Sequence, residues 1–114
     1  MALKLTTRTV DGVTVVEAAG RIVLGNETND LRDCVKALLF DGSTRLVLNL
    51  AQVDFVDSSG LGTLVGLHST AAARSAKIKL AAASKLFRDL LVVTKLLTVF
   101  DLFDTEAAAV ASFG

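Results

Sequence analysis

The stretch Val53–Gly62, which reads VDFVDSSGLG, decides the fold of this chain. It follows an apolar run, Arg45–Leu50, that is typical of a strand, and it leads into a helical pattern from about Ser59 to Ala73. Where a strand turns into a helix, the first backbone N–H groups of the helix lack partners within it. The helix dipole adds about half a positive charge at the same end. The turn therefore predicts a position that favours an anion, phosphate included.

Two interpretations of the polar turn fit its residue types. In the first, Asp57 or a serine is an ordinary N-cap, while Gly60 and Gly62 let the helix approach the sheet closely. In the second, the adjacent hydroxyls of Ser58 and Ser59 are presented behind the Asp57 carboxylate as a functional site. The residue types alone leave both interpretations open.

Length and composition predict one domain over residues 1–114, because 114 residues leave little room for a second. Hydrophobic residues make up 52%, which is enough for a core, and the formal net charge of zero argues against nucleic-acid binding. No apolar run reaches the roughly 18 residues that span a bilayer. The start, Met1–Thr6, lacks the regions of a signal peptide. Cys34 is the only cysteine and is expected to be a small buried hydrophobe. We therefore expect a cytoplasmic protein without membrane contact, and a monomer.

The hydrophobic pattern predicts strands alternating with helices. The expected strands are 3–10, 13–18 with an extended continuation over 21–24, 44–50, 77–81 and 97–103. The expected helices end near residue 40, span about 59–73 and 85–93, and include an Ala-rich final helix that ends near Phe113. Asp11-Gly12 predicts a hairpin turn, and Gly20 is expected to end the second strand. This order predicts an α/β fold with one mixed, mostly parallel sheet of four to five strands, about four helices and an antiparallel N-terminal hairpin.

Two glycines inside the central helix lower its stability, so we expect another interaction to compensate for them. Gly62 and Gly66 are four residues apart and lie together on the helix, and each costs about 1 kcal/mol relative to alanine. Close backbone packing is the expected compensation, with flexibility at a recognition surface as the alternative.

Residues for catalysis are scarce, so we expect no enzyme. His68 is the only histidine and lies in the same helix as Ser58, three helical turns away, so it cannot act as its general base. Asp54 and Asp57 form only a weak metal signal, and the sequence favours solvated turn acids instead. No catalytic site, metal or cofactor is predicted.

The string Asp57–Gly62, DSSGLG, in this strand–turn–helix context strongly resembles the signature of the STAS domain of anti-sigma factor antagonists. Weaker similarity extends to Gly20–Ile22 and to apolar positions between 90 and 100, so the resemblance covers almost the whole chain. It implies the STAS fold for residues 1–114.

The resemblance also implies a function in bacterial transcription regulation by partner switching. In this family the serine directly after the aspartate, here Ser58, is phosphorylated by the anti-sigma factor, which is itself a serine kinase. The unmodified form binds that kinase and releases the sigma factor, and a serine phosphatase restores the modified form. Ser59 is the alternative acceptor. The family often has an acidic residue where this chain has Val23, and the nearest acid is Glu27, so the resemblance does not extend to that kinase contact.

The expected partner-binding surface includes an exposed Leu61 and the turn at residues 24–26. Its full set is Leu24, Gly25, Asn26, Asp57, Ser58, Ser59, Gly60, Leu61 and Gly62. Two alternatives remain. The first is an unphosphorylated STAS subunit of a signalling scaffold or lipid-transport complex. The second is a small hydrolase that uses Ser58, for which the sequence offers no base.

Overall fold

The computed structural model describes residues 3–114, so Met1 and Ala2, part of the start discussed above, lie outside the described residues. Within residues 3–114 the chain forms five strands and four helices. The elements are β1 (Lys4–Val10), β2 (Val13–Ile22), α1 (Asn26–Phe40), β3 (Arg45–Val56), α2 (Ser58–Ala73), β4 (Lys77–Ala81), α3 (Lys85–Val93), β5 (Leu102–Phe103) and α4 (Glu106–Ala111). They form one sheet in the order β1-β2-β3-β4-β5. The pairing of β1 with β2 is antiparallel and the other pairings are parallel, which confirms the predicted α/β class.

The N-terminal hairpin has the turn that its sequence predicts. Asp11 and Gly12 both have positive φ, 51° and 79°. This left-handed pair matches the twist of the two flanking strands, and Asp-Gly is among the dipeptides that adopt it most readily. The hairpin places β1 at one edge of the sheet.

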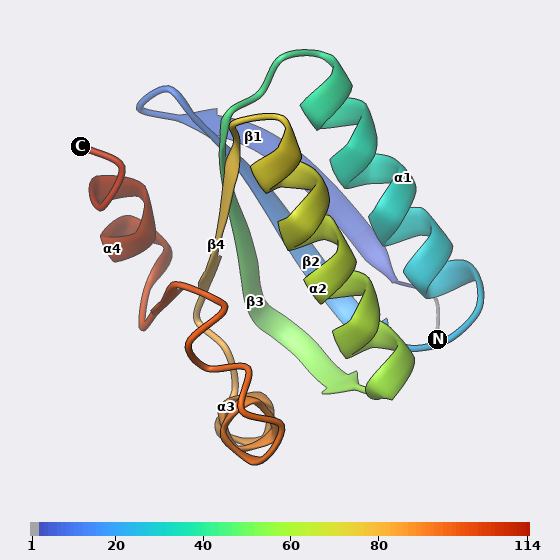
Figure 1. Ribbon diagram of the computed structural model, residues 1–114. Coiled ribbons are helices and arrows are strands. Elements are labelled where there is room, and N and C mark those ends of the chain that lie inside the picture. The colour runs from blue at the N-terminus through green and yellow to red at the C-terminus, as the bar shows by residue number, and fades with distance from the viewer. Residues whose placement is uncertain (1–2) are drawn as a thin grey trace.

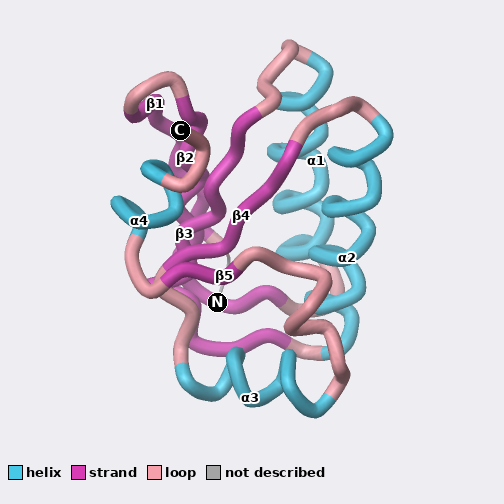
Figure 2. Tube along the Cα trace, turned by 60° about the vertical axis from the view of Figure 1, so that its left-hand side comes forward, coloured by secondary structure: helices cyan, strands magenta, loops and turns pink. Residues whose placement is uncertain are grey.

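The helices cover the two faces of the sheet unequally. The helices α1 and α2 lie side by side on one face (Figure 1), and α4 lies on the other, with α3 near one end of the sheet (Figure 2). Along β3, Leu46, Leu48 and Leu50 join the larger core cluster, whereas Val47 joins the cluster that contains Ala109 of α4. The continuous apolar run in β3 is explained because both faces of this strand are covered.

Gly20 does not end the second strand, contrary to the prediction. Strand β2 continues to Ile22, and β3 continues to Val56, where these two residues pair in parallel. The register shifts between Glu17 and Ala19 and again between Gly20 and Arg21. Such bulges bend a strand while it stays hydrogen-bonded. The pairing carries both strands to the start of α2.

The predicted strand over residues 97–103 is also mostly wrong, because only Leu102 and Phe103 pair with β4. The preceding residues instead close helix α3: Lys95 has a φ of 61°, and the Leu96 N–H donates to the Leu91 carbonyl. Phe100 is nevertheless buried in the larger core. A buried irregular segment is as apolar as a buried strand, so the hydrophobic pattern does not distinguish the two.

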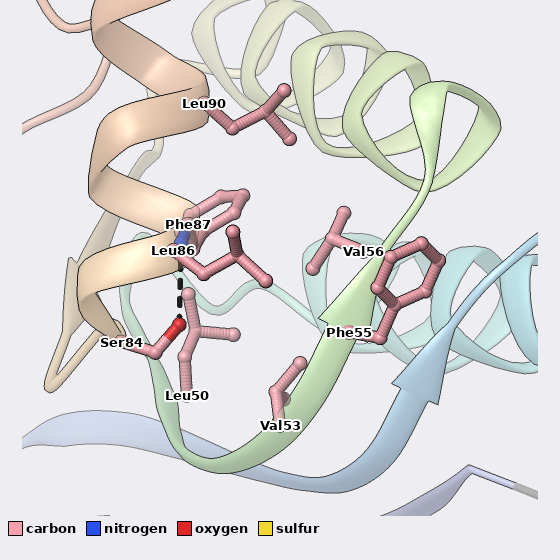
Figure 3. Close-up of a pocket in the computed structure, with 8 residues that line it drawn as sticks. All are labelled: Leu50, Val53, Phe55, Val56, Ser84, Leu86, Phe87 and Leu90. Atoms are coloured by element: carbon pink, nitrogen blue, oxygen red, sulfur yellow. Dashed lines mark hydrogen bonds between the residues drawn. The ribbon is translucent and has the colours of Figure 1, made fainter.

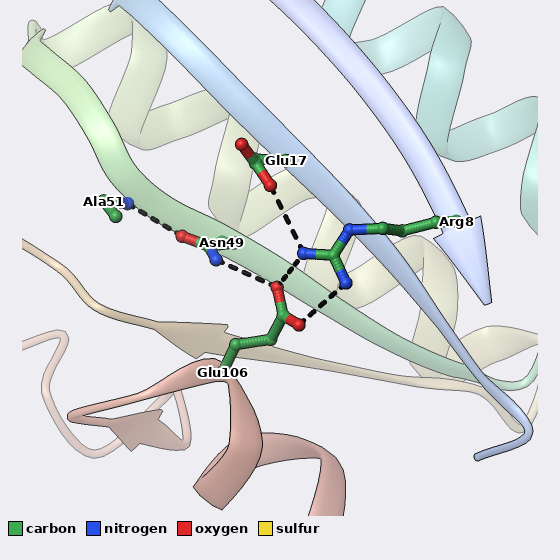
Figure 4. Close-up of polar contacts among 5 residues, drawn as sticks. All are labelled: Arg8, Glu17, Asn49, Ala51 and Glu106. Atoms are coloured by element: carbon green, nitrogen blue, oxygen red, sulfur yellow. Dashed lines mark hydrogen bonds and ion pairs between the residues drawn. The ribbon is translucent and has the colours of Figure 1, made fainter. Parts of the chain in front are cut away.

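A network of polar contacts links α4 to the sheet, on the face opposite α1 and α2. Glu106, at the start of α4, accepts from both terminal nitrogens of Arg8 on β1 and from the Asn49 amide at 3.0 Å (Figure 4). Arg8 also contacts Glu17 at 3.2 Å. The Arg8 hydrogen bonds hold the pKa of Glu106 below its ordinary value of 4.5. The contribution of Glu106 to stability is therefore present above pH 4.5 and is lost as the pH falls through its lower folded-state pKa.

Replacing Glu106 by glutamine should lower the free energy of unfolding at about pH 7 by no more than about 1 kcal/mol, because the Arg8 side chain is 41% exposed. The difference between variant and wild type should shrink towards about pH 3, as the wild-type carboxylate begins to take up a proton. Urea unfolding of both proteins at the two pH values measures this. A difference that does not depend on pH would mean that the charge of Glu106 contributes nothing.

Candidate functional site

Asp57 joins the start of α2 to the loop that precedes α1. It is the N-cap of α2, with extended φ and ψ of −90° and −178°. Its Oδ1 accepts from the Gly60 N–H at 2.7 Å, and its Oδ2 accepts from the Leu24 N–H at 3.1 Å. These bonds from Gly60 and Leu24 keep the pKa of Asp57 below its usual range. The carboxylate thus stays ionised and fixes two segments that are 33 residues apart in the chain.

Removing this carboxylate should destabilise the fold. We expect Asp57→Ala to lower the free energy of unfolding by about 1–2 kcal/mol, the usual range for a lost N-cap. Asp57→Asn should lose less, because its amide oxygen can still accept the Gly60 N–H, although the amide nitrogen cannot accept from Leu24. Urea denaturation of the three proteins measures the order. Equal stability of Asp57→Ala and wild type would contradict this role for the cap.

The two serines differ in exposure. Ser58 is the first residue of α2 and is exposed, whereas Ser59 is half-buried and lines a groove between α2 and α1. The Ser58 hydroxyl stands at the end of the helix where unpartnered N–H groups and the dipole favour negative charge. The hydroxyl is thus exposed at a position that favours negative charge.

Gly60 is required for close approach of α2 to the sheet. A Cβ added to Gly60 would lie 2.1 Å from the carbonyl oxygen of Ile22 in β2. The same carbonyl accepts the Asp57 N–H at 3.2 Å. The close approach to the sheet expected of Gly60 and Gly62 thus holds for Gly60, but a Cβ at Gly62 would meet nothing within 4 Å. The expected close packing of Gly62 and Gly66 within the fold is therefore wrong, since Gly66 is equally open.

The expected exposure of Leu61 is also wrong. Its side chain is only 6% exposed and packs in the larger core cluster with Leu64 and Leu67. These residues follow at i, i+3 and i+6, so Leu61 begins the apolar stripe of α2 instead of belonging to its surface. By contrast, Leu24 is 75% exposed, and Gly25 and Asn26 are exposed as well.

Only a small part of the candidate site is exposed to solvent. We call it the helix-tip surface, and it consists of Leu24, Gly25, Asn26, Ser58 and Gly62. The Asp57–Leu24 hydrogen bond brings its two halves together. Val23, which stands where the family often has an acidic residue, and Glu27, the nearest acid in the sequence, are both half-buried.

Two cavities lie near β3 and α2, and neither of them was predicted from the sequence. An apolar cavity of about 260 Å³ lies between the end of β3 and α3 (Figure 3). Its lining includes Phe55, which is 42% exposed, and Leu86 on α3. A more polar groove of about 400 Å³ lies between α1 and α2 and is lined in part by Arg32 and Lys36. The i, i+4 spacing of these two cations places them on one side of α1, but the sequence does not show that α2 lies opposite them.

The residues considered for catalysis lie apart from Ser58. His68 is ten residues further along α2, about 15 Å at the helical rise, and packs edge-on against Phe100 at 5.7 Å between ring centroids. Cys34 is half-buried beside the core, and burial raises the pKa of its thiol. Among residues 3–114 there is no cluster of three or more potential metal-ligating His, Cys, Asp or Glu side chains. A search of the same residues finds no helix with the length and apolar character to cross a bilayer.

A comparison with protein families identifies the fold. The family model described as the STAS domain matches residues 4–109. The chain belongs to the STAS domain family. This confirms the resemblance seen in the hexapeptide that begins at Asp57.

Solved structures agree with this assignment of the STAS domain. An anti-sigma factor antagonist from Mycobacterium paratuberculosis matches with a TM-score of 0.84 at 24% identity, covering 97% of this chain and 93% of that one. The antagonist SpoIIAA matches in its unphosphorylated form, with a TM-score of 0.73, 20% identity and coverage of 96% and 97%. The phosphorylated form of SpoIIAA, described as a Bacillus cell fate determinant, matches with a TM-score of 0.76, 20% identity and coverage of 97% and 100%. The STAS domain described here therefore has the fold of anti-sigma factor antagonists.

Proposed function

We propose that this protein is an anti-sigma factor antagonist that is switched off by phosphorylation of Ser58. In its unphosphorylated form it binds an anti-sigma factor serine kinase and releases the sigma factor. The observation that carries the proposal is the exposed Ser58 hydroxyl at the positive end of α2, next to a loop fixed by Asp57. We also propose that residues 1–114 act as one STAS domain, as a monomer in the bacterial cytoplasm.

The modification itself is a phosphoryl transfer from ATP. A bond forms between the Ser58 oxygen and the γ-phosphorus while the bond from that phosphorus to the β,γ-bridging oxygen breaks. ADP leaves, and the hydroxyl proton passes to a base of the kinase. A serine phosphatase reverses the change by hydrolysis. The chain therefore acts as a substrate and needs no catalytic residues of its own.

The electrostatics of the helix tip support a switch that changes binding without unfolding the domain. A phosphoserine carries about −1.5 to −2 charges, which the start of a helix accommodates. It would nevertheless stand next to the ionised Asp57 and close in sequence to the exposed Asp54. A partner surface shaped for a neutral hydroxyl would have to desolvate these charges together, and this lowers affinity.

Mapping the modified residue tests the proposal. The protein is incubated with its purified kinase and ATP, and mass spectrometry locates the phosphate. We expect one phosphate on Ser58 in the wild type, none in Ser58→Ala and one in Ser59→Ala. No modification of the wild type, or unchanged labelling of Ser58→Ala, would reject Ser58 as the acceptor. Recovery of the unmodified protein as a stable part of a large complex would instead favour a scaffold function.

A further inference from the structure

Two glycines of α2 are not explained by the isolated fold. Gly62 and Gly66 are exposed, and a Cβ added to either would meet nothing within 4 Å. Glycine inside a helix destabilises it relative to alanine. Gly60 compensates for this by letting α2 approach Ile22, but the other two glycines have no such neighbour. A molecule that approaches the backbone of α2 from outside would supply the missing compensation.

The two glycines lie in the groove between α1 and α2. On one side the groove is lined by Arg32 and Lys36 of α1, and on the other by Gly62, Thr63 and Gly66 of α2. Its volume is about 400 Å³. Glycines four residues apart lie on the same side of a helix, one turn from each other, so they form a flat strip along the groove.

The two charged side chains that line the groove, Arg32 and Lys36, are both cations. Arg32 bonds to the neutral Asn29 side chain at 3.0 Å and approaches the Thr63 hydroxyl at 3.5 Å. Neither Arg32 nor Lys36 takes part in an ion pair within residues 3–114. Helix α2 contains no aspartate, glutamate, lysine or arginine. The two cations, one helical turn apart, thus face a neutral strip of backbone.

We propose that this groove receives an acidic helix of the partner kinase, an inference that rests on the function proposed above. A helix can approach α2 closely at Gly62 and Gly66, where a Cβ would meet nothing within 4 Å, and acidic residues at i, i+4 spacing can pair with Arg32 and Lys36. The groove is continuous with the helix-tip surface, because Leu24 and Gly62 belong to both. The partner therefore binds along the side of α2 as well as over Ser58.

Binding measurements on matched variants test this docking groove. The purified kinase is titrated with wild type, with the double variant Arg32→Glu/Lys36→Glu and with Gly62→Ala and Gly66→Ala. We expect the double variant to bind on the order of 100-fold more weakly and each glycine variant about 10-fold more weakly. The glycine variants should also have a raised melting temperature, which separates this effect from misfolding. Arg45→Glu, an exposed charge reversal at the start of β3, should bind as the wild type does.

A second arm does not depend on the kinase. A helical Ala-rich peptide with glutamate at every fourth position is added to ¹⁵N-labelled protein. We expect amide shifts at Gly62, Thr63 and Gly66 that disappear in the double variant. The same shifts with inorganic phosphate alone would indicate a small-anion site and overturn the helix. A dimer of this chain that the double variant dissociates would overturn it as well.

The two arms distinguish failure of this inference from failure of the proposed function. If the kinase binds wild type and all groove variants equally while phosphorylation of Ser58 abolishes binding, the groove inference is wrong and the switch stands. If no anti-sigma factor kinase binds while the acidic peptide occupies the groove, the proposed function fails and the acidic-helix site stands.

Discussion

Replacing Gly60 by alanine is expected to lower the free energy of unfolding by about 3 kcal/mol or more, although only one methyl group is added. The added carbon would lie 2.1 Å from the carbonyl oxygen of Ile22 and 2.9 Å from the Cγ2 atom of the Ile22 side chain. Real contacts between such atoms do not fall below about 3 Å, and the carbonyl is backbone that cannot rotate away. The end of β2 and the start of α2 would have to separate, breaking the Asp57–Ile22 bond.

The control for this prediction is Gly62→Ala, two residues further along the same helix. Its added carbon meets nothing within 4 Å, so alanine should raise stability by about 0.5–1 kcal/mol through its better helix propensity. Urea denaturation of the two variants and the wild type measures both values. A Gly60→Ala protein as stable as the wild type would show that α2 does not need to approach Ile22 so closely.

Replacing Ser58 by aspartate is expected to weaken binding of the kinase about 100-fold or more while the domain stays folded. Hundredfold weaker binding corresponds to about 2.7 kcal/mol, and desolvating an added carboxylate beside Asp57 costs at least this much. The fold should persist because Ser58 is exposed at a helix start, where an acidic residue is favourable. Calorimetric titration measures affinity, and circular dichroism and melting temperature measure the fold.

Two controls separate charge from size and from position. Ser58→Asn has the same side-chain shape as aspartate without its charge, so its affinity should stay within about tenfold of the wild type. Ser69→Asp places a carboxylate at an exposed position of the same helix, away from its start, and should leave affinity unchanged. Equal loss in the aspartate and asparagine variants would attribute the effect to size.

The central layout of this fold could be predicted from its sequence because strong local signals agreed with one another. Asp11-Gly12 specified the hairpin, and the continuous apolar run in β3 specified a strand covered on both faces. Ser84 precedes the apolar stripe of α3 and is a residue type favoured at N-caps, and its hydroxyl does accept the Phe87 N–H at 3.2 Å. Each of these features depends on residues that are close together in the chain.

Three features were not predicted because they depend on contacts between segments that are far apart in the chain. The extension of β2 past Gly20 depends on parallel pairing with the end of β3, which lies more than thirty residues away. The burial of Leu61 depends on which side of α2 faces the sheet, and the motif DSSGLG does not specify this. The groove beside Arg32 exists because α1 and α2 lie next to each other, and neither helix alone indicates it.

The most direct test of the account compares the same protein with and without a phosphate on Ser58. Both forms, separated after treatment with the kinase and ATP, are titrated with the kinase, and their amide spectra are recorded. We expect spectral changes confined to the residues around the start of α2, together with a dissociation constant about 100-fold higher for the phosphorylated form. Equal affinities for the two forms, or phosphorylation that unfolds the domain, would contradict it.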